Sequence, residues 1–126
     1  MISQSDQELI SQLITTIKKD REIIGVNHFG SSTRERVFND IDICLFTKDS
    51  ITLQKKIKYK LSLPEHFDLN FFQDLPLYIK HEVLKTGKFL LITQIDALYD
   101  IVHQFIKKYS DFQPHFKKYL ELIKNS

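Results

Sequence analysis

The sequence predicts an α/β or α+β fold in which a small mixed β-sheet is flanked by helices. Apolar residues recur at the spacing of an amphipathic helix in two stretches, 9–17 and 98–106. Residues 40–46 and 66–72 instead alternate between apolar and polar side chains, which is the period of a half-buried strand. Helical and extended patterns follow one another along the chain, which is typical of a layered domain.

Length and composition indicate one ordinary soluble domain that spans residues 1–126. Hydrophobic residues make up 42% of the chain and charged residues 27%, as in other globular proteins. The 18 basic and 16 acidic residues give a net charge of +2, which does not favour direct nucleic-acid binding. A single cysteine excludes an intrachain disulfide framework and fits a reducing compartment. The chain starts without signal-peptide features and has no bilayer-length apolar run, so we expect a cytoplasmic location with no membrane contact.

The first half of the chain predicts a helix, two strands and a short helical turn. The segment Ser5-Asp6-Gln7-Glu8 has the spacing of a capping box, so we expect a helix to begin there. The apolar face of this helix is a stripe made of Leu9, Ile10, Leu13, Ile14 and Ile17. The elements that follow are a strand over 23–29, a helical turn over 32–36 and a strand over 40–46.

The second half of the chain predicts more helix than strand. Ser50 is placed to cap a helix over 51–61. We expect its stripe of Leu53, Ile57 and Leu61 to face the core, with lysines on the other side. After a strand over 66–72, Pro76 suits the first turn of a helix over 77–85 that ends at a C′ glycine, Gly87. The last predicted elements are a strand over 88–93 and helices over 95–109 and 113–123.

Two carboxylates share one parity of the strand over 40–46. Asp40 and Asp42 alternate with the apolar residues Ile41 and Ile43, which should face a core. The carboxylates then emerge on the opposite face, roughly 7 Å apart along the strand. Like charges this close raise each other's pKa unless a cation lies between them. Because carboxylate oxygens suit Mg²⁺, a divalent metal is the natural neutraliser.

Two further features raise this acidic pair above an ordinary solvated surface. Gly30 and Ser31 follow the strand over 23–29, and a glycine turn that leads into a helix offers backbone N–H groups to phosphate. Asp68 lies on the more polar face of a third alternating stretch. Three strands that present polar groups at one level predict a metal and phosphate centre, and so a nucleotide site. The five histidines lack metal-ligand spacing, and Cys44 is interpreted as a buried structural thiol.

Gly30-Ser31 followed by Asp40-Ile41-Asp42 resembles the signature of the nucleotidyltransferases of the DNA polymerase beta superfamily. The resemblance extends through Asp68 and over 77–91, and it implies a nucleotidyltransferase-like fold. The length of the chain resembles the minimal nucleotidyltransferases, many of which pair with HEPN-domain proteins as toxin–antitoxin modules. Departures are confined to the loop before the first aspartate: the gap after the glycine is about two residues shorter than usual, and Glu35 and Asn39 replace a glycine and a serine.

The resemblance implies roles for six residues. Asp40, Asp42 and Asp68 would be the catalytic carboxylates and would hold Mg²⁺ in a two-metal site. Gly30, Ser31 and Arg34 would bind the nucleotide, although Arg34 is open to a second interpretation as a surface charge. The implied reaction moves AMP from ATP, or a nucleotide from another nucleoside triphosphate, to a hydroxyl of a partner HEPN ribonuclease toxin. The hydroxyl of a tyrosine is the expected acceptor, and the chain would act as the antitoxin.

Two alternatives remain open from the sequence. One is a non-catalytic antitoxin that neutralises its partner by binding alone. Retention of all three carboxylates argues against it, because an acidic cluster is costly for a pure scaffold. The other is nucleotidyl transfer to a small molecule such as an aminoglycoside. Enzymes of that kind generally carry an additional helical domain, which the sequence does not predict.

Overall fold

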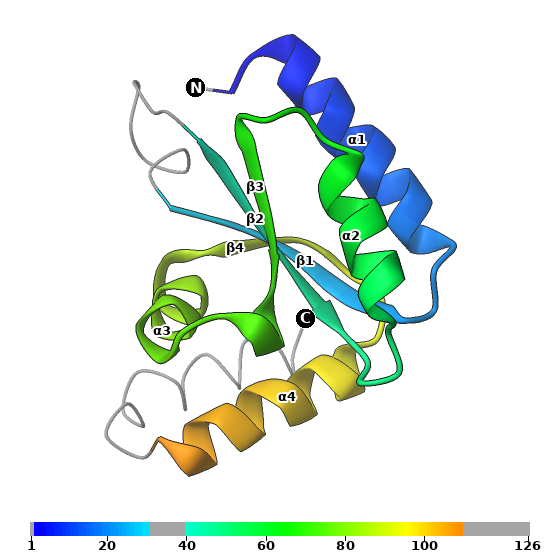
Figure 1. Cartoon of the computed structure of the whole chain (residues 1–126). Helices are drawn as coiled ribbons and strands as arrows, with labels where there is room; N and C mark the ends of the chain where they lie inside the picture. Colours follow the sequence, from blue (N-terminus) through cyan, green and yellow to red (C-terminus); the bar gives the residue numbers. More distant parts are fainter. Residues whose placement is uncertain (1, 31–39, 110–126) are drawn as a thin grey trace.

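The computed structural model describes residues 2–30 and 40–109, which form one four-stranded sheet with helices on both faces (Figure 1). The strand order is β3-β2-β1-β4. β1 runs antiparallel to β2 and β4, whereas β2 and β3 are parallel, so the sheet is mixed as predicted. The strands are β1 (Ile23–Phe29), β2 (Ile41–Thr47), β3 (Phe67–Phe71) and β4 (Lys88–Ile92). The helices are α1 (Gln4–Lys18), α2 (Leu53–Leu61), the short 3₁₀ helix η2 (Phe72–Asp74), α3 (Leu77–Thr86) and α4 (Ile95–Lys108).

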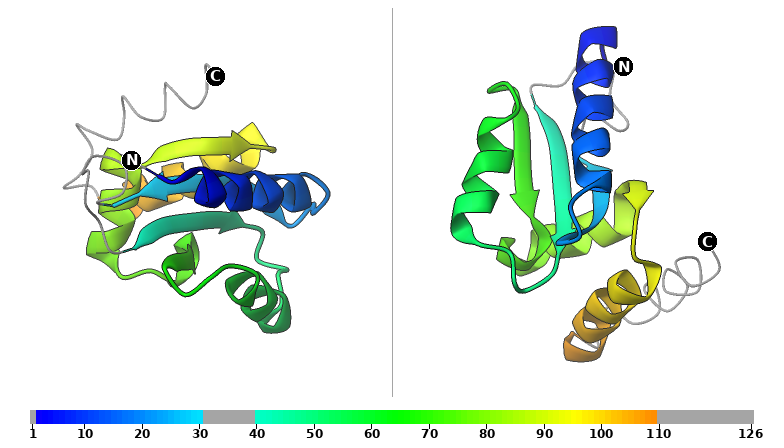
Figure 2. Two further views of the ribbon diagram at one scale, coloured as in Figure 1. Left: turned by 90° about the horizontal axis from the view of Figure 1, so that it is seen from above. Right: turned by 90° about the vertical axis from the view of Figure 1, so that its right-hand side faces the viewer.

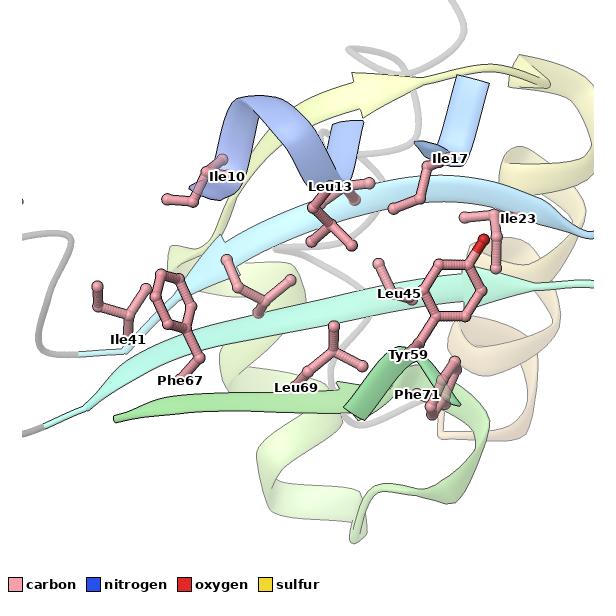
Figure 3. Close-up of a cluster of buried hydrophobic side chains, with 12 residues drawn as sticks. Ile10, Leu13, Ile17, Ile23, Ile41, Leu45, Tyr59, Phe67, Leu69 and Phe71 are labelled. Atoms are coloured by element: carbon pink, nitrogen blue, oxygen red, sulfur yellow. The ribbon is translucent and has the colours of Figure 1, made fainter. Parts of the chain in front are cut away.

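Each face of the sheet has its own apolar core, because different helices cover the two faces (Figures 1 and 2). The core under α1 and α2 contains one parity of β2 and β3 together with the α1 stripe (Figure 3). The core under α3 and α4 contains the opposite parity of β2, including Cys44 and Phe46. No helix within the described residues is long and apolar enough to cross a membrane.

Helix α1 begins two residues earlier than its predicted start. The N-cap is Ser3, whose hydroxyl accepts a hydrogen bond from the backbone N–H of Asp6 at 3.2 Å. Ser3 and Asp6 have the same spacing as the predicted cap, and the correct cap is the first of two overlapping candidates. The predicted apolar stripe is confirmed, since Ile10, Leu13 and Ile17 are buried.

Strand β2 is buried on both faces, although its alternating pattern predicted one polar face. Cys44 and Phe46 share the parity of Asp42 and are fully buried, because α3 and α4 cover that face. The ring of Phe46 stacks on that of Phe72, with centroids 4.4 Å apart. The thiol of Cys44 is structural as predicted, and burial raises its pKa. The polar part of this face is therefore confined to the end of the strand near Asp42.

The predicted orientation of helix α2 is wrong. Leu53, Ile57 and Leu61 point to solvent, and their exposed fractions are 72%, 47% and 79%. The buried residue of the helix is Tyr59, whose hydroxyl donates a hydrogen bond to Asp20 at 2.6 Å. A tyrosine that packs its ring against a core and pairs its hydroxyl is favoured over an aliphatic side chain that can only pack.

The predicted caps of α2 and α3 also need correction. Thr52 caps α2, whereas Ser50 donates a hydrogen bond to the carboxylate of Glu22 at 3.0 Å. Gly87 follows α3, but its φ of −71° is not left-handed. A Cβ at Gly87 would lie 2.1 Å from the side-chain oxygen of Asn27, so close packing requires the glycine. The other described elements are confirmed to within about two residues, and the predicted turn over 32–36 and helix over 113–123 lie outside the described residues.

Candidate active site

The parallel pairing of β2 and β3 brings two of the predicted site carboxylates together. Asp42 lies directly opposite Asp68 in the register of the two strands. Neighbouring strands are about 4.8 Å apart, so the two residues are immediate neighbours across the sheet. Ile41 and Ile43, on either side of Asp42, are buried in the α1–α2 core, which directs Asp42 to the other face. The strands of Asp42 and Asp68 are therefore neighbours in the sheet.

Gly30 lies directly after β1 and borders the site next to Asp42. Phe29 pairs with Asp42, and the chain turns at Gly30 with a left-handed φ of +83°. A Cβ at Gly30 would lie 2.1 Å from carboxylate oxygen Oδ2 of Asp42. Glycine is required here both for the backbone angle and for the close approach to the carboxylate. Ser31 and Arg34, the other two predicted nucleotide-binding residues, lie outside the described residues.

The site concentrates negative charge around Asp42. Burial, and to a smaller extent the nearby charges of Asp68, Asp40 and Glu82 in that order of importance, raise the pKa of Asp42 to about 6. Asp40 and Asp68 are exposed, whereas Asp42 is only partly exposed. The carboxylate of Asp68 accepts a hydrogen bond from the side-chain amide of Asn70 at 2.9 Å, which helps to orient it.

Glu82 is a member of this cluster that the sequence did not indicate. It lies on α3, which packs on the same face of the sheet as the Asp42 side chain, and its charge acts on Asp42. Within the sequence, Glu82 is one acidic residue on an amphipathic helix and has no distinguishing neighbour or spacing. Only the docking of α3, through the buried residues Val83 and Leu84, brings its carboxylate near the strand ends. No local signal could have found it.

The donor chemistry of the cluster fits a hard divalent cation. Among residues 2–30 and 40–109, no three acidic, histidine or cysteine side chains are grouped as a complete metal site. The sheet nonetheless supplies the adjacent carboxylates of Asp42 and Asp68, and the pKa of Asp42 is raised first by burial and then by the negative charges of its acidic neighbours. Oxygen ligands with excess negative charge are those that Mg²⁺ prefers.

This arrangement of strands, glycine turn and paired carboxylates defines a nucleotidyltransferase of the polymerase beta type. Residues 11–96 match the family model described as polymerase beta, nucleotidyltransferase. The chain therefore belongs to this family, and the predicted family, fold class and enzyme class are confirmed.

A named relative and a solved structure are similar to this chain. The chain is 27% identical over 99 residues to a Methanocaldococcus jannaschii protein named protein adenylyltransferase MJ1547, and the match covers 77% of this chain and 78% of that protein. The fold is also similar to a chain in the crystal structure of a point mutant of the toxin–antitoxin MntA–HpeT. That chain has a TM-score of 0.62 and 20% identity, over 98% of this chain and 99% of that one.

A further solved structure is the complex of a tri-AMPylated Shewanella oneidensis HEPN toxin with its MNT antitoxin. A chain of this complex has a TM-score of 0.57 and 20% identity to the present chain, over 98% of this chain and 99% of that one. At this level of identity the two structural comparisons establish the shared fold.

Proposed function

We propose that this protein is a Mg²⁺-dependent adenylyltransferase that moves AMP from ATP to a hydroxyl group of a partner protein. The observation that carries the proposal is the register of Asp42 opposite Asp68, with the turn at Gly30 closing on Asp42. Membership of the polymerase beta nucleotidyltransferase family supports the reaction type. The relative named as a protein adenylyltransferase supports AMP as the transferred group and a protein as the acceptor.

The partner in this proposal is a HEPN-domain toxin, and the acceptor is a tyrosine hydroxyl. The similar fold in a complex that contains an AMPylated HEPN toxin supports this choice. The chain would act in the cytoplasm as a single-domain antitoxin. Asp40 and Asp68 are exposed, so an acceptor carried by another protein can reach them. An added AMP places a negative phosphate and a bulky base on the toxin, which would obstruct an RNA substrate.

The positions of the site residues support the roles proposed for them. Asp40, Asp42 and Asp68 would hold Mg²⁺, which when bound neutralises the triphosphate and the departing pyrophosphate. Gly30 has no side chain, so the turn approaches the carboxylate of Asp42 closely, and its backbone would bind the triphosphate held there.

In the transfer step, the acceptor oxygen bonds to the α-phosphorus of ATP while the bond to the pyrophosphate oxygen breaks. Asp68 is exposed and oriented by Asn70, and it would take the proton of the acceptor hydroxyl.

The test combines the purified chain, Mg²⁺ and ATP with a HEPN-domain protein as the partner. Mass spectrometry should detect AMP on a tyrosine of the partner. Asp42→Asn and Asp68→Asn should each lower the rate by about 100-fold or more, whereas Asp100→Asn, an exposed carboxylate on α4, should not change it. A partner that is silenced without any added mass, and equally by the Asp42→Asn variant, would establish an antitoxin that acts by contact. AMP found only on an added aminoglycoside would establish a small-molecule acceptor.

A further inference from the structure

A row of aliphatic side chains runs along the outer surface of α2. Leu53, Ile57 and Leu61 follow one another at four-residue spacing, so they lie on one side of the helix. They are three of the six large hydrophobic side chains that are exposed in the described residues. Single exposed hydrophobic residues are common on protein surfaces, but a contiguous row indicates an interaction site. We call these three residues the α2 ridge.

Contacts on the inner side of α2 hold the ridge outward. Tyr59 is buried and donates its hydroxyl hydrogen bond to Asp20. Lys55 forms an ion pair with the same carboxylate at 3.2 Å and a second one with Glu22. A rotation that buried the ridge would break these interactions and expose the Tyr59 ring. The ridge is therefore part of the stable surface of the domain.

A second contact, with η2 and the end of β3, fixes the same orientation. The ammonium group of Lys56 lies 2.9 Å from the carboxylate of Asp74 and 5.4 Å from the centre of the Phe71 ring. The positive charges of Lys55 and Lys56 are thus matched by acidic groups of the domain itself.

The remaining charges of the helix border the ridge on both sides. α2 contains four lysines and no acidic residue. At 100° per residue, Lys60 lies next to Leu53 and Ile57 on one border, and Lys58 lies beyond Leu61 on the other. Both lysines are exposed, and within the described residues neither has an ion pair. The surface is thus an apolar row between two positive borders.

We propose that the α2 ridge is a docking surface for an amphipathic helix of a partner protein, whose own aliphatic stripe is bordered by aspartate or glutamate. Apolar rows of two helices interlock when they pack, and opposite charges on the borders select the partner. A second copy of this chain fits less well, because two ridges in contact would bring lysines against lysines. An anionic membrane fits less well too, since the row is narrow, has no aromatic residue, and has the exposed acids Asp49 and Glu65 beyond its ends.

The ridge and the proposed active site lie on opposite faces of the sheet. α2 packs in the core on one face, whereas the side chains of Asp42 and Asp68 lie on the face covered by α3 and α4. A helix bound to the ridge therefore leaves the carboxylates accessible. Docking at the ridge does not depend on the proposed transfer of AMP, so the two can be tested separately.

The direct test measures binding of two synthetic helical peptides to the full chain by fluorescence anisotropy. Both peptides carry leucine at every turn, one with glutamate on both borders and its twin with lysine. The glutamate peptide should bind at least about 10-fold more tightly than its twin. The triple variant Leu53→Ser/Ile57→Ser/Leu61→Ser should weaken that binding at least about 10-fold, whereas Tyr78→Ser, a 72% exposed residue on α3, should not change it.

A charge-swapped variant keeps the test informative if the triple variant is poorly folded. Lys58→Glu/Lys60→Glu alters only exposed side chains, and it should reverse the preference toward the lysine peptide. Equal binding of the two peptides, or no binding of either, would overturn the proposal. Self-association in sedimentation that the triple variant abolishes would assign the ridge to a second copy. Ridge-dependent binding to phosphatidylglycerol vesicles would assign it to a membrane. Either of these results would also overturn the proposal.

Discussion

Gly30→Ala is the substitution that tests the geometry of the candidate site most directly. A left-handed backbone costs a residue with a side chain about 1–2 kcal/mol, and φ at Gly30 is +83°. The new methyl group would also lie 2.1 Å from Oδ2 of Asp42, a separation that real Cβ atoms essentially never show. Either the turn or the carboxylate must therefore move. We expect the free energy of unfolding to fall by about 1–3 kcal/mol.

The matched control is Gly25→Ala in β1, the strand that ends just before Gly30. Its Cβ would lie 3.3 Å from the carbonyl oxygen of Leu91 and 3.4 Å from the ring of Phe89, and Gly25 has no positive φ. Neighbours at those distances need to move by only a few tenths of an ångström, so the loss of stability should be smaller than for Gly30→Ala.

Two measurements compare the glycine variants. Urea denaturation gives the free energy of unfolding. Labelled ATP, Mg²⁺ and the HEPN-domain partner protein give the rate of AMP transfer to that partner, at a temperature where both variants are folded. A displacement of Asp42 by about 1 Å should lower the rate about 100-fold in Gly30→Ala, with little change in Gly25→Ala. Equal stability and equal rates for the two variants would refute the inferred contact between the turn and the carboxylate.

Three further predictions concern buried or titrating groups. Asn27 is fully buried, and its amide nitrogen and oxygen have no hydrogen-bond partner among the described residues. Asn27→Ala should therefore cost less than about 1 kcal/mol of unfolding free energy, compared with about 2–5 kcal/mol for Ile24→Ala in the same strand. Burial alone would raise the pKa of Asp20, but hydrogen bonds, above all that from Tyr59, lower it. Tyr59→Phe should therefore cost about 1–3 kcal/mol near neutral pH, and denaturation curves should show this difference shrinking as the pH falls through the lowered pKa. Asp42→Asn should be as stable as the parent below pH 3.8, the ordinary pKa of the carboxyl, and more stable above about pH 6, because the raised pKa means that ionisation of Asp42 costs stability. Thermal unfolding in a chelating buffer at both pH values checks this sign, and a less stable variant at high pH would contradict it.

The parts of the fold and site that the sequence predicted correctly rest on local patterns. Alternation over 40–46 is a property of adjacent residues. It correctly predicted that the Asp42 side chain lies on the opposite face of the strand from Ile41 and Ile43. The glycine at position 30 was expected at a strand end where the backbone approaches another group closely. The structure has that close approach, although the group is the carboxylate of Asp42. Short-range periodicity was sufficient for these assignments.

The features that the sequence missed depend on contacts between distant segments. The rotation of α2 is decided by the bond from Tyr59 to Asp20, which are 39 residues apart, and no periodicity within the helix contains that information. The nearness of Glu82 to Asp42 likewise depends on where α3 docks. The burial of the second face of β2 also depends on contacts between distant segments. In the sequence, Phe46 is one apolar residue among polar residues of the same parity, whereas in the structure its ring stacks on that of Phe72.

The two faces of the sheet have complementary energetic roles at the candidate site. The charged form of Asp42 is unfavourable at this site, because burial and then the neighbouring carboxylates raise its pKa. The residues that alternate with the site carboxylates are Ile41, Ile43, Phe67 and Leu69, which are between 0% and 7% exposed in the α1–α2 core. Close packing behind the strands leaves them little freedom to separate, even though the charges on the front repel one another. The apolar core is therefore what holds the acidic pair in register, and a cation or a nucleotide complex need not assemble it.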